Sequence, residues 1–308
     1  NIRNSLILFI NNGKQIANKF YSVIIDVKEI EMPELPEVET IKNTVAKTLL
    51  GAKIAKVTVR QRQFRQNVPE DFEKRIEGAT VIALKRIAKY MLVELDNGQT
   101  IIWHFGMSGK IKIESILPNQ LDKHDHIIFE TSNGVIIYND VRRFGLVTVC
   151  DSDKLKENPL LKELGLDPWE KELTPEYLLG ILHSKKCAIK VALLDQSIIC
   201  GIGNIYASEI LYKARILPTR ESKSISIEEC ALIIKYTRDI LEKAIAAGGS
   251  TIHDFKRPDG DIGYFQNQHC VYNKTGQRCP DCCCNGKKHI EKIVLGGRST
   301  FFCPVLQK

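Results

Sequence analysis

Residues 32–40 read MPELPEVET, and this stretch marks the point at which the predicted folded chain begins. Upstream, residues 1–31 mix apolar and polar side chains without a sustained period. Downstream, apolar residues recur at spacings of three and four, which is one face of a helix, and Gly51 follows as a stop. These apolar residues are Val38, Ile41, Val45 and Leu49. The pattern predicts an extension over residues 1–32, followed by a helix that packs against a sheet.

The extension has a second interpretation as a targeting segment. The apolar run at residues 6–10 follows Arg3, as in the start of a signal sequence. However, this run is short for such a signal, and no small-residue cleavage site follows it. We therefore favour an extension that is not part of the active protein.

Length and composition limit the class of protein. A chain of 308 residues is long enough for two domains and a small module, and 44% hydrophobic with 26% charged residues is ordinary for a globular protein. No apolar run approaches the roughly 20 residues that span a bilayer, so we expect no membrane partner. The net charge of +7 is mild and does not by itself indicate nucleic-acid binding.

In the middle of the chain, the sequence pattern changes from that of β-strands to that of helices. Short runs of β-forming residues follow one another up to residue 150, separated by turn signals such as Asp96-Asn97-Gly98. The predicted strands are 56–60, 90–95, 100–105, 126–130, 135–139 and 146–150. They indicate an antiparallel β-sandwich or barrel. After a polar linker at 151–173, helical patterns dominate, and the clearest begins with a capping box at Ser226 and Glu229.

The cysteines gather near the C-terminus. Six of the ten lie between residues 270 and 303, namely Cys270, Cys279, Cys282, Cys283, Cys284 and Cys303. A disulfide scaffold would be typical of a secreted chain below about 100 residues. The clustering instead indicates a metal site in a reducing compartment. A bound metal ion would cross-link the C-terminal module, which is too small to be stable on its own core alone.

Pro33 has two chemical interpretations. Proline followed by acidic residues is a common helix entry, because the ring suits the first turn and acids complement the helix dipole. Alternatively, a proline at a free N-terminus is a secondary amine that can act as a nucleophile. Inside a chain the same nitrogen is an amide and is not nucleophilic. The second interpretation requires translation from Met32 and removal of that methionine.

Five motifs together resemble one enzyme family. The octapeptide at 33–40 is similar to the N-terminus of formamidopyrimidine-DNA glycosylases, and four further family signatures follow in order. They are RIAKY at 86–90, HFGMSG at 104–109, DVRRFG at 140–145 and GIGNIYASE at 201–209. The resemblance covers residues 32–308 and implies a multi-domain α+β fold. It implies a β-sandwich catalytic domain with flanking helices over 33–150, a helix-two-turn-helix domain over 174–265, and a C-terminal β-hairpin zinc finger over 266–308.

The resemblance also implies a reaction and its residues. Pro33 would attack C1′ of an oxidised purine nucleotide, such as 8-oxoguanine or a formamidopyrimidine opposite cytosine, in base-excision repair. Glu34 would act as general acid and base, Glu37 would orient the lesion, and Lys89 would bind a phosphate. Successive eliminations at the 3′ and 5′ sides would then cut the strand, which makes the protein both a glycosylase and an abasic-site lyase.

The implied partner is damaged double-stranded DNA. Met107, Arg142 and Phe144 would fill the gap left by the flipped nucleotide, with Phe144 as the wedge. The other implied DNA contacts are His104, Lys190, Asn204 and Arg298. Since Lys190 is not in a signature, an exposed helix lysine is an equal interpretation. We further expect a monomer in the bacterial cytoplasm that associates with the nucleoid through DNA.

The implied cofactor is one structural Zn²⁺ ion held by two C-x-x-C pairs. Cys279 and Cys282 form a sound first pair, but Cys303 is followed at the last ligand position by Leu306, which cannot bind zinc. Cys283, Cys284 and His289 are the candidate substitutes. The alternative is a loosely ordered tail without metal.

Two other functions remain open at this point. The endonuclease VIII branch uses the same amine on oxidised pyrimidines, although Leu35 and the Met107, Arg142 and Phe144 set favour the purine branch. A catalytically inactive DNA-binding remnant would also explain the blocked Pro33 and the missing fourth cysteine.

Overall fold

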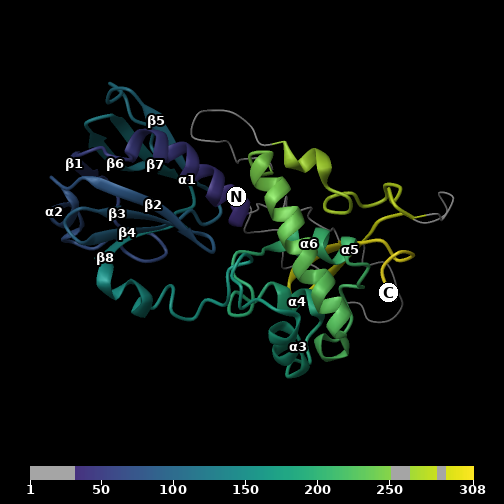
Figure 1. The fold of residues 1–308 in the computed structure, drawn as a ribbon. Coiled ribbons are helices and arrows are strands. Elements are labelled where there is room, and N and C mark those ends of the chain that lie inside the picture. The colour runs from purple at the N-terminus through teal and green to yellow at the C-terminus, as the bar shows by residue number, and fades with distance from the viewer. Residues whose placement is uncertain (1–31, 251–263, 283–288) are drawn as a thin grey trace, which may run out of the picture.

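The computed structural model describes residues 32–250, 264–282 and 289–308. A β-sandwich domain and a helical domain lie side by side, and helix α1 (Leu35–Leu49) runs from the helical domain into the sandwich (Figure 1). Leu35 belongs to the apolar core of the helical domain, whereas Val38, Ile41, Val45 and Leu49 belong to that of the sandwich. The helix predicted from these spacings is confirmed, and it joins the two cores.

The sandwich consists of two four-stranded antiparallel sheets. One sheet has the order β1-β6-β7-β5 and the other the order β2-β3-β4-β8. Buried residues from both sheets, including Trp103 and Tyr138, form one apolar cluster between them. The strands and the short helix of this domain are β1 (Ile54–Val59), α2 (Phe72–Ile76), β2 (Val81–Ile87), β3 (Tyr90–Leu95), β4 (Gln99–His104), β5 (Gly109–Glu114), β6 (Asp125–Thr131), β7 (Gly134–Asp140) and β8 (Leu146–Asp151).

Two of these strands, β2 and β5, are absent from the sequence prediction. Each lies at an edge of its sheet, where only one side pairs with a neighbour. Both carry basic residues, as edge strands often do. Lys85 and Arg86 interrupt the apolar run of β2, whereas in β5 lysine alternates with only two isoleucines. The pairing with β3 and β7 identifies both as strands.

The helical domain follows a linker that contains the short 3-10 helix η1 (Ser152–Glu157). Its helices are α3 (Pro175–His183), α4 (Ile189–Leu193), α5 (Asn204–Lys213) and α6 (Ile227–Ala246), with the 3-10 turns η2 (Ser222–Ser224) and η3 (Phe265–Gln268). The capping box predicted for α6 is confirmed, because the Glu229 amide donates to the Ser226 hydroxyl and the Ser226 amide donates to the Glu229 carboxylate. None of the helices in the described ranges is long and apolar enough to cross a membrane.

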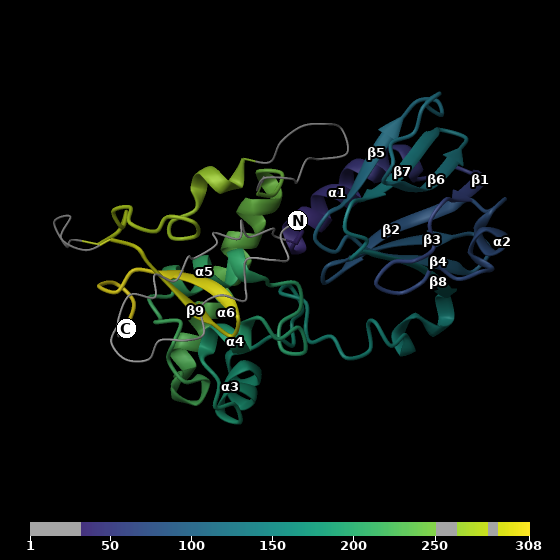
Figure 2. The same cartoon turned by 180° about the vertical axis from the view of Figure 1, so that it is seen from behind.

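A C-terminal hairpin of β9 (Glu291–Leu295) and β10 (Arg298–Phe302) packs on the helical domain (Figure 2). Phe301 joins the same apolar cluster as Ile205 and Tyr212 of α5. The hairpin is thus an extension of the helical core, as the predicted C-terminal module requires, and its turn reaches back toward the sandwich.

The chain that leads to the hairpin is held by one buried carboxylate, Glu209 of α5. Glu209 accepts hydrogen bonds from the backbone amides of Cys270, Val271 and Tyr272 at 2.8 to 2.9 Å. Burial raises the pKa of Glu209 to about 7. Three backbone donors in the protein interior depend on this side chain.

Replacing Glu209 with alanine should therefore destabilise the fold strongly. Each buried donor left without an acceptor costs about 1–3 kcal/mol, so we expect a loss of about 3 kcal/mol or more in the free energy of unfolding. Urea unfolding of the purified protein measures it. Glu163→Ala, at a carboxylate whose side chain is 82% exposed, is the control. A loss no greater than that of the control would contradict the assigned role of Glu209.

Candidate active site at the junction of the two domains

A cavity of about 720 Å³ opens where the two domains meet. It brings together residues that are far apart in the sequence, from the start of α1, the β2–β3 turn, the end of β4, two sandwich loops, the loop before α5 and the hairpin turn. The predicted residues that line it are Glu34, Lys89, His104, Met107, Arg142, Asn204 and Arg298. Pro33 is buried between Met32 and Glu34, both of which line the cavity.

Glu34 is fixed at the N-terminus of α5. Its carboxylate accepts hydrogen bonds from the backbone amides of Ile205 at 3.0 Å and Tyr206 at 3.5 Å. Gly203 permits this approach, since a Cβ there would lie 2.2 Å from the carboxyl carbon of Glu34. Burial raises the pKa of Glu34, and the nearby Lys89 ammonium opposes that rise. The site thus holds a carboxyl group that retains its proton more readily than an exposed glutamate.

Glu37 lies directly behind Glu34. One oxygen accepts the Tyr206 hydroxyl at 2.7 Å and the Ser250 amide at 2.8 Å, and the other accepts the Glu34 amide at 3.0 Å. Burial, with repulsion from Glu34, raises the pKa of Glu37 to about 7. Glu37 therefore ties the start of α1 to α5 and to Ser250, the last described residue before the gap at 251–263.

Two nitrogen groups line the same cavity as Glu34. Lys89 is buried in the β2–β3 turn, and its burial lowers the pKa of its ammonium group. The Nδ1 atom of His104 accepts the Gly106 amide at 3.0 Å, and burial lowers the pKa of His104 to about 4. At neutral pH the imidazole is therefore uncharged, with its proton on Nε2. A cationic donor and a neutral donor stand beside each other.

Arg142 and Phe144 project from one loop of the sandwich. The guanidinium carbon of Arg142 lies 4.6 Å from the centre of the Phe144 ring, and Phe144 remains 45% exposed. The Arg142 amide donates to the Ser108 hydroxyl at 3.0 Å, which fixes the loop beside Met107. An exposed aromatic ring next to a cation is suited to stacking on a base.

Lys190 does not lie at the surface. Its ammonium group is fully buried and donates to the Asn204 side chain at 2.7 Å, the Ser299 carbonyl at 2.9 Å and the Thr300 hydroxyl at 2.7 Å. Lys190 thus links the N-terminus of α5 to the hairpin, and Arg298 at the start of β10 is presented beside it at the cavity.

Three of the predicted metal ligands meet in the structure. The sulfur atoms of Cys279, Cys282 and Cys303 all lie within 4.8 Å of one another and are buried. Three converging thiols are a donor set that fits zinc, although a tetrahedral site needs a fourth ligand. Leu306 packs partly buried against the helical core, and His289 is exposed opposite Arg278. Cys283 and Cys284 lie outside the described residues.

Sequence reasoning missed several residues of the site. Gly203 and Tyr206 lie inside the GIGNIYASE stretch, but only Asn204 was singled out there. Arg65 also lines the cavity and contributes to the lowered pKa of His104, yet it stands in no recognised motif. Ser250 carried no signal, because its bond to Glu37 is made by the backbone amide.

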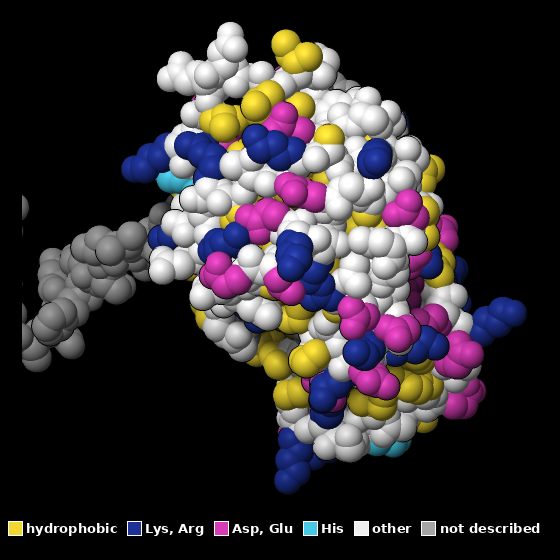
Figure 3. Space-filling model, turned by 90° about the vertical axis from the view of Figure 1, so that its left-hand side faces the viewer, with side chains coloured by type: hydrophobic (Ala, Val, Ile, Leu, Met, Phe, Trp, Pro, Cys, Tyr) yellow, Lys and Arg dark blue, Asp and Glu magenta, His cyan; other side chains and the backbone are white. Residues whose placement is uncertain are grey.

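The sandwich end of the molecule carries mixed charge. Figure 3 looks at this end and shows Lys and Arg side chains interspersed with Asp and Glu. On this face no continuous basic area stands out.

Both domains that form this cavity match known proteins. Residues 32–147 match the model of the formamidopyrimidine-DNA glycosylase N-terminal domain, and residues 164–256 match that of its H2TH domain. A formamidopyrimidine-DNA glycosylase of Novosphingobium aromaticivorans is 43% identical over 278 residues, and one of Zymomonas mobilis is 42% identical over 278 residues. Each alignment covers 90% of this chain and all of the relative.

Solved structures agree with the sequence relatives. A complex of a Lactococcus lactis FPG mutant with DNA that contains Fapy-dG has a TM-score of 0.82 and 33% identity, over 90% of this chain and all of that one. The MutM (FPG) protein of Thermus thermophilus has a TM-score of 0.80 and 31% identity, over 89% of this chain and 98% of that one. The predicted fold class is confirmed, and the chain belongs to the formamidopyrimidine-DNA glycosylase family.

Proposed function

We propose that the chain, once it begins at Pro33, is a DNA glycosylase and abasic-site lyase that removes oxidised purines such as 8-oxoguanine and formamidopyrimidines in base-excision repair. The observation that carries the proposal is the buried Glu34 carboxyl group at the junction cavity, immediately after Pro33 and opposite Lys89. The family shown by the relatives agrees with it.

The reaction begins with a bond between the Pro33 nitrogen and C1′ of the damaged nucleotide. The glycosidic bond breaks, and the base leaves with its bonding electron pair and takes up the proton that the Pro33 amine gives up. The C1′–O4′ bond of the sugar then breaks, which leaves C1′ doubly bonded to the Pro33 nitrogen as an iminium ion. Glu34, whose pKa is raised by burial, donates a proton to the ring oxygen as the sugar opens and then accepts protons during the two eliminations.

The remaining residues hold the DNA. We assign phosphate binding to Lys89, His104, Asn204 and Arg298, all of which line the cavity. We assign Met107, Arg142 and Phe144 to filling the space of the flipped nucleotide. We assign Lys190 to holding the hairpin, since its ammonium group is already bonded to Asn204, Ser299 and Thr300. Glu37 acts at the lesion through its bonds to Glu34 and Ser250.

We propose the following functional domains. Residues 33–150 form the catalytic domain, 151–173 the linker, 174–265 the helix-two-turn-helix domain and 266–308 the zinc-finger module, while residues 1–32 are an extension. The enzyme acts as a monomer on damaged double-stranded DNA in the bacterial cytoplasm, at the nucleoid. The DNA complexes among the solved relatives support the choice of partner.

We propose that Cys279, Cys282 and Cys303 hold one structural Zn²⁺ ion, which would staple the C-terminal module. Elemental analysis of the purified protein should find about one zinc per chain. Cys303→Ser should lower that content severalfold, because it removes one of three buried thiols. Cys150→Ser, outside the cluster, should leave it unchanged. Equal zinc content in both variants would refute the assignment.

Borohydride trapping tests the proposed function. Protein that begins at Pro33 should form a covalent adduct with a duplex that contains 8-oxoguanine opposite cytosine, because the reagent reduces the iminium ion. Preferential trapping on thymine glycol would instead indicate the oxidised-pyrimidine branch. Lesion binding without any adduct would indicate an inactive remnant.

A further inference from the structure

A partly buried ionic network crosses the junction of the two domains, and Arg86 of β2 lies at its centre. The Arg86 side chain is 9% exposed. Its guanidinium group donates to the Glu39 carboxylate at 3.0 Å, to the Asp167 carboxylate through two nitrogens at 3.0 Å each, and to the Ala88 carbonyl at 3.1 Å. One cation therefore connects α1, the linker and the β2–β3 turn.

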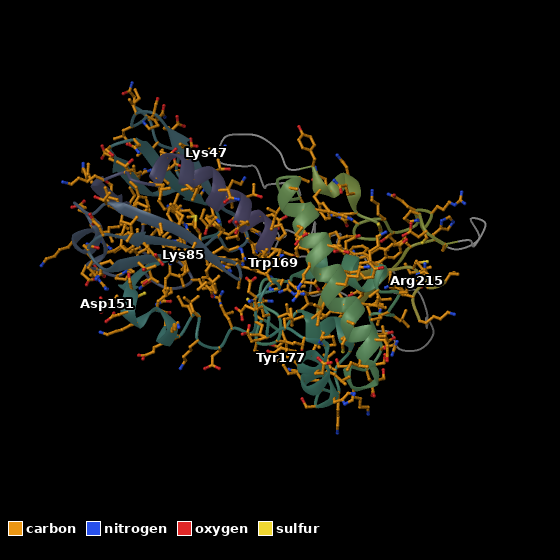
Figure 4. All side chains as sticks on the ribbon, viewed as in Figure 1. Lys47, Lys85, Asp151, Trp169, Tyr177 and Arg215 are labelled. Atoms are coloured by element: carbon orange, nitrogen blue, oxygen red, sulfur yellow. The ribbon has the colours of Figure 1, made fainter. Side chains whose placement is uncertain are left out.

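The linker end of this network is anchored to the helical domain. The Arg86 guanidinium carbon lies 5.9 Å from the centre of the Trp169 ring, and the Trp169 indole donates to Glu242 of α6 at 3.0 Å. Figure 4 shows Trp169 between the two domains. The Arg238 side chain, also on α6, donates to the Pro168 carbonyl at 2.7 Å. The linker segment that Arg86 binds, residues 167–169, thus also forms hydrogen bonds with α6.

The same segment runs beside the loop that supports Glu34. Leu166 forms a parallel bridge with Ile199, and the Cys200 amide donates to the Leu166 carbonyl at 3.0 Å. The chain then continues directly into Gly201 and Gly203, whose backbone abuts Leu35 and Glu34. One end of the network is therefore the turn that carries Lys89, and the other end is the loop that places Glu34 and Asn204.

We propose that Arg86 is a positioning residue that sets the separation between Lys89 and the Glu34–Asn204 side of the cavity. The inference rests on the proposed function for its substrate, a lesion-containing duplex. Arginine suits the role because its planar fork donates to several acceptors at once, which the single ammonium of a lysine cannot reproduce. Without the cation, the Asp167 carboxylate would lose its ion pair with Arg86, whereas Glu39 would keep its ion pair with Lys42.

The Lys89 turn is sensitive to this support. Ala88 has a φ of +51°, in the left-handed region that costs a residue with a Cβ about 1–2 kcal/mol. The bond from Arg86 to the Ala88 carbonyl helps to hold the turn in that conformation. Because a misplacement of about 1 Å by a distant mutation can cost roughly a hundredfold in rate, release of the turn should be visible in catalysis and in binding.

The test compares Arg86→Gln in two backgrounds, in protein that begins at Pro33. With Lys89 present, we expect R86Q to lower the single-turnover excision of 8-oxoguanine roughly ten- to hundredfold and to weaken binding of a tetrahydrofuran abasic-analogue duplex. In a Lys89→Ala background, R86Q should change either quantity less than about twofold, because the residue through which it acts is gone. R86K, which keeps the charge but not the fork, should resemble R86Q.

Lys85→Gln is the matched control, since Lys85 precedes Arg86 on β2, its side chain is 60% exposed, and its ion pair is with Glu94 of the neighbouring strand β3. It should leave rate and binding unchanged. Asp167→Asn should reproduce R86Q, and the two together should not add. Equal losses in both Lys89 backgrounds, or no loss, would overturn the inference. The duplex-binding measurement needs no turnover, so an inactive wild type would count against the proposed function while binding still decides the role of Arg86.

Discussion

Protein that begins at Pro33 is expected to excise 8-oxoguanine and to form a borohydride-trapped adduct, whereas the same chain with Met32 retained is expected to do neither. An amide nitrogen shares its lone pair with the carbonyl group, and breaking that conjugation costs on the order of 18–20 kcal/mol. Since each 1.36 kcal/mol is a factor of ten in rate, no measurable attack on C1′ would remain. Met32 also lines the cavity, so it would occupy space meant for the nucleotide.

Single-turnover excision and trapping, run on both forms side by side, measure this effect. Unfolding of both forms in urea serves as the control, because one added residue should leave the folding of the two domains intact. An adduct from the Met32 form, mapped by peptide mass to another residue, would show that a different amine performs the chemistry.

Glu34→Gln is expected to have the second largest effect. Loss of a positioned general acid and base costs typically 10²–10⁴ in rate, and the amide of glutamine cannot deliver or accept the proton. The variant should still fold, because its side-chain oxygen can accept the Ile205 amide as the carboxylate does. Single-turnover excision measures the loss, and Glu130→Gln, a partly exposed carboxylate of β6, is the control. Retention of full excision activity would remove Glu34 from the mechanism.

The same variant should alter the pH dependence of folding. Burial raises the pKa of Glu34 above its ordinary 4.5, so above that pH the folded chain retains a proton that the unfolded chain has released. The contribution of Glu34 to stability is therefore complete below pH 4.5 and falls as the pH rises through the raised pKa. The E34Q variant should lose less stability between pH 5 and pH 8 than the wild type, as judged by urea unfolding. A steeper loss would contradict the direction of the shift.

Much of the fold follows from local patterns. The α1 and α6 helices were predictable because each has an apolar face at helical spacing and a glycine after its end, and α6 also has a capping box. The β3, β4, β6, β7 and β8 strands were predictable within a residue or so because their β-forming runs are bounded by turns. The edge strands β2 and β5 were not predicted, because Lys85 and Arg86 interrupt the apolar run of β2, and β5 has only two apolar residues, Ile111 and Ile113.

The site was predictable only as a set of motifs. Sequence order gave Glu34, Lys89, His104 and Arg142 as candidates, and the structure brings their side chains to one cavity, while their individual roles remain predictions. Sequence patterns could not predict the contacts that hold these side chains in place, because those contacts are made by backbone atoms or between the two domains. Gly203 is needed because of a carboxylate 169 residues earlier in the chain, and that dependence has no local signature.

The buried bonds of Lys190 give the hairpin a second attachment made entirely of protein atoms. A hairpin fastened in two places tolerates the weakening of one fastening, since the other still holds β10 against α5. Substitution within the cysteine cluster, where we propose a Zn²⁺ ion, then becomes less harmful than in a hairpin that depends on metal alone. Such redundancy offers a physical reason why a chain of this family can carry Leu306 where a fourth cysteine is expected and still present Arg298 at the cavity.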